Sequence, residues 1–100
     1  DSFDGNDQMV APAMKGAMGN CYAQLGQLDK ASSMLLKAAD EADNTTLSPI
    51  YLKQAGEILV KQGKYDDAIK AYTSIKEKYF RSYQAMDIDK YIEQAKLLKK

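Results

Sequence analysis

Residues 48–80 read SPIYLKQAGEILVKQGKYDDAIKAYTSIKEKYF, and this stretch decides the fold. Ser48 followed by Pro49 predicts a helix start, because serine can cap the first turn and proline fits the first helical position. Gly63 interrupts the helical pattern, and Asp66 is expected to cap a second helix. The stretch therefore predicts two helices joined by one tight turn.

A weaker copy of this layout lies 37 residues earlier. The shift matches five pairs of identical residues, namely Pro12 with Pro49, Gly19 with Gly56, Gly26 with Gly63, Asp29 with Asp66, and Ala31 with Ala68. A repeat period of this size indicates stacked units that share one core. We expect helices at about 9–25 and 30–42, two more within 48–80, and a fifth capped by Ser82.

The composition favours an all-α protein and excludes several functions. Hydrophobic residues make up 45% of the 100 residues, with only two Phe and no Trp, which suits closely packed helices. The formal net charge is zero, which argues against a nucleic-acid partner. No histidine is present, so the commonest general base and metal ligand is missing. We expect no catalytic residues, no metal and no other cofactor.

The region before the repeat has its own features. Residues 1–8 are acidic and turn-rich and are interpreted as a linker or the tail of a preceding element. The helix at 9–25 carries an apolar stripe that includes Cys21, which we expect to be a buried, inert thiol. Glycine inside a helix usually has a packing reason, so Gly16 and Gly19 predict that a helix from outside this chain covers this one.

The pattern resembles the tetratricopeptide repeat, a helix–turn–helix unit of 34 residues. In the first copy the signature positions hold Met18, Gly19, Tyr22, Gly26, Leu28, Ala31, Leu35 and Ala38. In the second copy they hold Ala55, Gly56, Leu59, Gly63, Tyr65, Ala68, Tyr72 and Ile75. The early aromatic of the family is Lys15 or Leu52 here, and its closing proline is Asp43 or Phe80.

This resemblance implies a short right-handed α-solenoid over residues 9–100. Repeat 1 would span about 12–47, repeat 2 about 48–81, and a capping helix about 82–99. A second likeness, carried by residues 19–26, 47–50 and 87–96, is to the C-terminal repeats of membrane-anchored Bacteroidetes-type proteins similar to the ancillary subunit of the bacterial Sec translocon. It implies a missing N-terminal anchor and a place at the periplasmic face of the inner membrane. Without it, the cytoplasm is the expected compartment.

The family commonly binds peptides in a groove lined by the first helix of each repeat. Carried over to this chain, the groove residues would be Ala13, Gly16, Asn20, Ala23, Gln24, Ile50, Lys53, Glu57, Val60 and Lys61. A secondary contact is expected at the basic–aromatic cluster around Lys76, Lys78 and Arg81, and Tyr51 and Tyr83 are candidates for partner contact. Tyr72 and Tyr91 fall on apolar stripes and are expected in the core.

The leading hypothesis is therefore a scaffold that binds a protein or peptide, with no nucleic acid and no direct membrane contact by this fragment. The alternative is a structural packing module, including a homodimer through the helix at 9–25. An enzyme is the remote third hypothesis.

Overall fold

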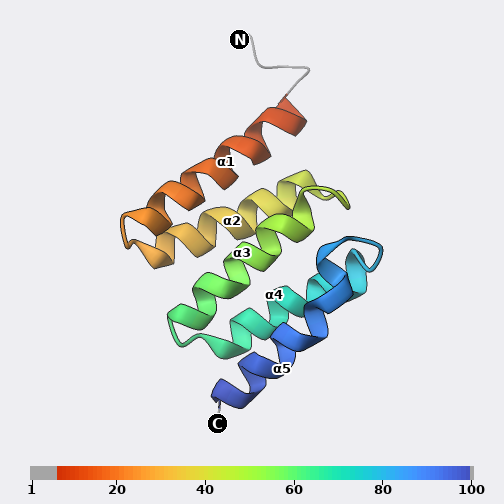
Figure 1. Ribbon diagram of the computed structural model, residues 1–100. Helices are drawn as coiled ribbons and strands as arrows, with labels where there is room; N and C mark the ends of the chain where they lie inside the picture. The colour runs from red at the N-terminus through yellow and green to blue at the C-terminus, as the bar shows by residue number, and fades with distance from the viewer. Residues whose placement is uncertain (1–6, 100) are drawn as a thin grey trace.

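The computed structural model describes residues 7–99, with side chains from Ala13 onward. The helices are α1 (Asp7–Gln24), α2 (Leu28–Ala42), α3 (Ser48–Lys61), α4 (Tyr65–Lys78), the 3-10 helix η1 (Gln84–Asp87) and α5 (Ile88–Lys99). Each α-helix packs against the next along the chain, so that α1 and α5 form opposite ends of the stack (Figure 1). The predicted all-α fold is confirmed.

Two tight turns, after α1 and after α3, share one backbone geometry. Gly26 and Gly63 have φ angles of 79° and 78°, a left-handed conformation that glycine adopts without a steric penalty. The next residue in each turn donates its N–H back to the preceding helix, Gln27 to Tyr22 and Lys64 to Leu59, both at 2.9 Å. The predicted helix-ending glycines are confirmed, and the 37-residue period holds at atomic detail.

The prediction that Asp29 and Asp66 cap helices is wrong. α2 and α4 begin one residue before these aspartates, and neither helix has a side-chain cap. Asp29 instead accepts hydrogen bonds from the side chains of Gln62 and Lys64, the latter at 3.0 Å, which lower the pKa of its carboxyl group. Asp66 forms an ion pair with Lys99 at 2.6 Å. Each aspartate therefore connects its helix to the C-terminal end of the next α-helix along the chain.

Ser48 fastens the loop between α2 and α3 rather than capping a free helix end. Its buried hydroxyl donates to the Ala39 carbonyl at 2.7 Å and accepts from the Asn44 N–H at 3.0 Å. Pro49 occupies the first turn of α3, as predicted. Pro12 does not do the same in α1, because α1 begins at Asp7 and extends upstream of that proline.

The remaining helix boundaries differ from the prediction by small shifts. Ser82 accepts the Ala85 N–H at 3.2 Å, and the fifth helix then starts as the 3-10 turn η1 before continuing as α5. α1 starts two residues earlier than expected, and residues 1–6 of the expected linker lie outside the described residues.

The glycines of α1 and α3 are contact points between helices. A Cβ built on Gly19 would lie 2.8 Å from Cγ of Leu35, and one built on Gly56 would lie 2.8 Å from Cζ of Tyr72. Leu35 and Tyr72 are themselves 37 residues apart, so the same close approach is used twice. Gly16 is covered in the same way by the Tyr51 ring. Because the chain itself covers both glycines of α1, the expectation that an outside helix covers them is wrong.

Candidate functional site

A hollow between α3 and α5 brings charged groups above an aromatic floor. It has a volume of about 240 Å³, and we refer to it as the α3–α5 hollow. Its lining is Glu57, Val60 and Lys61 from α3, Tyr72 from α4, and Tyr91, Gln94, Ala95 and Leu98 from α5. The hollow therefore spans three helices, because side chains of α3 and α5 meet over Tyr72 of α4, which lies between them in the stack (Figure 1).

The floor of the α3–α5 hollow is a pair of tyrosines with a cation beside it. The rings of Tyr72 and Tyr91 have centroids 5.8 Å apart at an angle of 46°. Lys53 Nζ lies 4.4 Å from the Tyr91 centroid, close enough for a favourable cation–π interaction. Lys53 also lines a second hollow of about 440 Å³ with Tyr83, Gln84, Met86 and Asp87. Lys53 therefore contacts Tyr91 of the α3–α5 hollow and also lines the second hollow.

The Tyr72 hydroxyl lies in an environment that disfavours its charged form. Burial, the nearby Glu57 carboxylate and the neighbouring Tyr91 together raise the pKa of Tyr72 to about 12. The ring is only 2% exposed, and it rests on Gly56. Tyr72 is thus a core residue whose edge is presented to the hollow, and its expected core position is confirmed.

We expect the folding stability that Tyr72 contributes to fall between pH 10 and 12. The folded protein keeps the hydroxyl protonated with a pKa of about 12, whereas the unfolded chain loses the proton near pH 10. The contribution is therefore complete below pH 10 and is lost as the pH rises through the folded pKa. Urea unfolding of the native protein and Tyr72→Phe at pH 8 to 12 should give stability differences that shrink over this window.

The matched control is Tyr83→Phe, whose ring is 84% exposed. A loss of stability between pH 10 and 12 that Tyr72→Phe removes and Tyr83→Phe leaves in place would assign the effect to Tyr72. Parallel curves for the native protein and Tyr72→Phe would show that the Tyr72 hydroxyl is equally easy to ionise in both states.

The structure brings the predicted groove residues of the second copy together. Glu57 and Lys61 line the α3–α5 hollow, and Lys53 stacks beside it on Tyr91. Val60 also lines the hollow, whereas Ile50 is half-buried at the start of α3. Among the described residues, neither Glu57 nor Lys61 forms an ion pair within the chain. Their charges are therefore available to a ligand.

The first-copy residues lie elsewhere. Ala13, Asn20 and Gln24 are exposed on α1 and line neither of these two hollows, and Ala23 packs against the core. Gly16 is buried beneath Tyr51, so a ligand cannot reach it. Tyr51 is itself only 9% exposed, so its predicted role in partner contact is wrong.

The predicted basic cluster near the end of α4 is partly occupied by contacts within the chain. Lys76 pairs with Asp89 of α5 at 2.8 Å, and this contact raises the pKa of Lys76. The Arg81 guanidinium lies 5.6 Å from the Phe80 ring, and Lys78 is exposed. Lys76 therefore links α4 to α5 through an exposed ion pair.

Cys21 is exposed, so the expectation of a buried thiol is wrong. The helix presents its glycine side to α2 and turns the stripe that includes Cys21 to solvent. The apolar residues of α1 alone therefore do not indicate which side of this helix packs against the rest of the chain.

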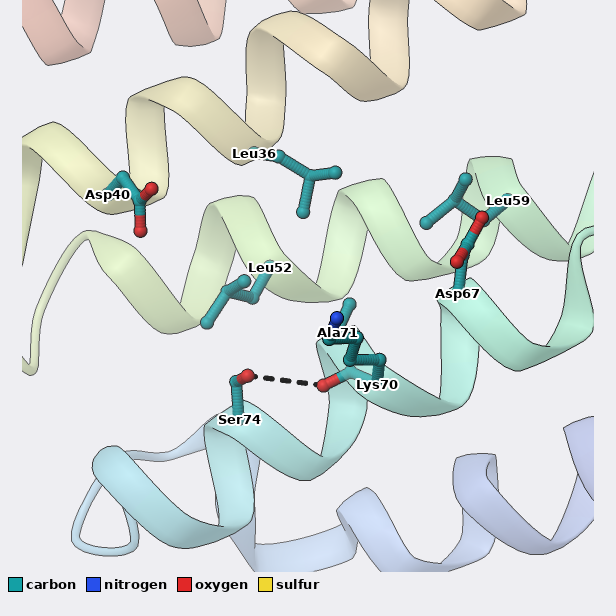
Figure 2. A pocket seen from close by; sticks show the side chains of 8 residues that line it. All are labelled: Leu36, Asp40, Leu52, Leu59, Asp67, Lys70, Ala71 and Ser74. Carbon is teal, nitrogen blue, oxygen red and sulfur yellow. Dashed lines mark hydrogen bonds between the residues drawn. The ribbon is translucent and has the colours of Figure 1, made fainter.

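A groove on the other side of α3 was missed by sequence reasoning. Leu59 and Glu57 are about 200° apart around a helix, so this outer groove and the α3–α5 hollow use different faces of α3. It measures about 440 Å³ and is lined from three helices (Figure 2) by Leu36, Asp40, Leu52, Leu59, Asp67, Lys70, Ala71 and Ser74. No single helix pattern identifies such a groove, because it forms only where α2, α3 and α4 meet.

Among the described residues, 7–99 with side chains from Ala13, no three of the potential ligand side chains His, Cys, Asp and Glu come together as a metal site would require. No helix in that range has the length and apolar character needed to cross a membrane. Comparisons with family models, with curated proteins and with solved structures find no match to this chain.

Proposed function

We propose that this chain is a tetratricopeptide-like scaffold that binds a peptide or partner helix at the α3–α5 hollow. The observation that carries the proposal is the pairing of unpartnered charges with a partly apolar hollow. Glu57 and Lys61 stand at its rim, while Val60, Tyr72 and Leu98 supply apolar surface within it. Charged groups around an apolar pocket are typical of surfaces that anchor one side chain and orient the rest of a ligand.

The repeat assignment is supported by contacts that recur at 37 residues. The glycine turns, the glycine contacts with Leu35 and Tyr72, and the aspartate contacts with Gln62 and Lys99 each occur in both copies. In such a stack the first helices of successive repeats share one face. That face is where α3 and α5 form the hollow.

The charges indicate what kind of peptide fits. Lys53 is already engaged with Tyr91, so Lys61 is the cation that the α3–α5 hollow offers beside the Glu57 carboxylate. The best match is a peptide that inserts one apolar side chain over Tyr72 and places a carboxylate near Lys61. A basic residue next to it would meet Glu57.

Selection of random 12-residue peptides on the immobilised protein tests the proposal. Enriched peptides should combine an apolar anchor with an acidic residue. Lys61→Glu should weaken their binding at least tenfold, because attraction to the acidic residue becomes repulsion. Affinity measured by fluorescence anisotropy gives the comparison.

The matched control is Lys37→Glu, which makes the same charge change on an exposed position of α2 that lines a different hollow. It should leave peptide affinity unchanged. If selection enriches no sequence, or if enriched peptides bind the Lys61→Glu protein as well as the native one, the hollow is not the binding site.

A further inference from the structure

One side of α1 carries an apolar stripe that no other part of the described residues covers. Met14 is 57% exposed, Met18 43% and Leu25 70%, and Cys21 between them is exposed as well. Large hydrophobic side chains in one contiguous row on a helix are unusual on a free surface and mark an interaction site. We refer to these four residues as the α1 stripe.

The 37-residue period shows what the α1 stripe corresponds to. Met14 matches Tyr51 of α3 and Ile88 of α5, Met18 matches Ala55 and Ile92, and Cys21 matches Ile58 and Ala95. All six matching side chains in α3 and α5 are at most 9% exposed. The same three helix positions are therefore buried in two copies and open in the third.

The helix that precedes each copy explains the difference. α3 packs against α2, and α5 packs against α4, so in both cases the second helix of one repeat precedes the stripe-bearing helix of the next. We propose that the α1 stripe docks a helix of the same kind as α2 and α4: amphipathic, alanine-rich on its buried side, and placed on α1 as α2 is on α3. The proposed contact continues an interface that the molecule already uses twice.

The fourth position of the stripe specifies the partner further. Leu25 matches Gln62 and Lys99, which bind Asp29 and Asp66 in the first turns of α2 and α4. Leucine offers no hydrogen bond or charge to such an aspartate. The helix that docks on α1 should therefore carry an apolar residue where α2 and α4 carry aspartate.

A second copy of this chain fits the α1 stripe less well. α2 and α4 of another copy are already enclosed between neighbouring helices. The other end of the stack offers α5, where the position that matches Gly19 and Gly56 is the exposed Glu93. A charged side chain there prevents the close helix approach that both glycines allow. The structure thus favours a distinct helix over self-association.

The test adds such a helix to the full chain. A copy of residues 28–47, which contains no cysteine, is fused ahead of residue 1, so that Cys21 remains the only thiol. Docking should slow alkylation of Cys21 by iodoacetamide at least tenfold relative to the parent protein. A second fusion with Asp29→Leu in the added copy should slow it further, because leucine then meets Leu25.

The matched control fusion carries Ser32→Glu and Ala39→Glu in the added copy. In α2 these residues contact α3, through Gln62 and Ser48 respectively, so the charges should prevent docking and restore the parent alkylation rate. If the first fusion alkylates as fast as the parent, the proposal fails. An added segment that stays unfolded by circular dichroism counts equally against it, since docking is what should fold so short a helix.

Sedimentation of the parent protein tests whether a second copy of this chain covers the α1 stripe instead of a distinct helix. We expect a monomer at micromolar concentration with a rapidly alkylated Cys21. A dimer in which Cys21 is protected would overturn the proposal and assign the α1 stripe to a second copy.

Discussion

Replacing Leu35 with alanine is expected to lower the free energy of unfolding by about 3–5 kcal/mol. The side chain is fully buried between α1 and α2, where its Cγ faces the bare Cα of Gly19. Truncation removes apolar contacts and leaves a cavity that the neighbouring helices cannot close without moving. Since domains of this size are stable by only about 5–15 kcal/mol, the variant should lose a large part of its stability.

The neighbouring residue supplies the control. Leu36 has the same chemistry and lies on the same helix, but it is 37% exposed and lines the outer groove. Leu36→Ala should cost less than about 1 kcal/mol, because little new cavity forms. Urea unfolding followed by circular dichroism measures both variants. Equal costs for the two variants would mean that the α1–α2 contact is not the tight one described here.

The helices and turns could be predicted because their causes are local. Gly26 and Gly63 adopt a conformation that other residues avoid, and Pro49 suits a first turn, so single residues mark these boundaries. The error at Asp29 and Asp66 arose because their carboxylates bind partners 33 residues further along the chain. A capping residue and an inter-repeat contact look alike in a local pattern.

The orientation of α1 could not be predicted from the apolar stripe. Met14, Met18 and Cys21 have the spacing of a buried face, yet they are exposed, while Gly16 and Gly19 mark the side in contact. Glycine is informative here because it has no side chain, and a side chain of another helix fills the space that is left. A glycine inside a helix therefore marks the side of that helix that is in contact. The identity of the covering residues, Tyr51 and Leu35, depends on how whole helices cross.

Only the α3 side of the α3–α5 hollow followed from the resemblance. Glu57 and Lys61 were expected on the groove, but Tyr91 and Gln94 were interpreted as parts of a terminal capping helix. Extending the 37-residue shift once more aligns Gln94 with Glu57 in the sequence. By this alignment α5 corresponds to α1 and α3. The same extension identifies the positions of α5 that match the α1 stripe.

Gly56→Ala is expected to destabilise the protein by about 1–3 kcal/mol, although alanine favours helix formation over glycine by about 1 kcal/mol. The steric term wins because a Cβ at this position would lie 2.8 Å from Cζ of Tyr72. The Tyr72 ring is 2% exposed and its centroid lies 5.8 Å from that of Tyr91, so it has little room to retreat. Overpacking of a helix contact should therefore exceed the gain in propensity.

A double-mutant cycle with Tyr72→Ala isolates this clash. Removing the ring removes the three atoms nearest to the new methyl group, and Gly56→Ala should then stabilise the Tyr72→Ala protein by about 0.5–1 kcal/mol. The sign of the glycine substitution thus reverses between the two backgrounds, giving a coupling of about 1.5–4 kcal/mol between residues 56 and 72. Urea unfolding of the four proteins measures this coupling.

Stabilisation by Gly56→Ala in the native background would contradict the prediction. It would show that α3 and α4 are further apart than the contact between Gly56 and Tyr72 requires, and that the floor of the α3–α5 hollow is packed less tightly than described.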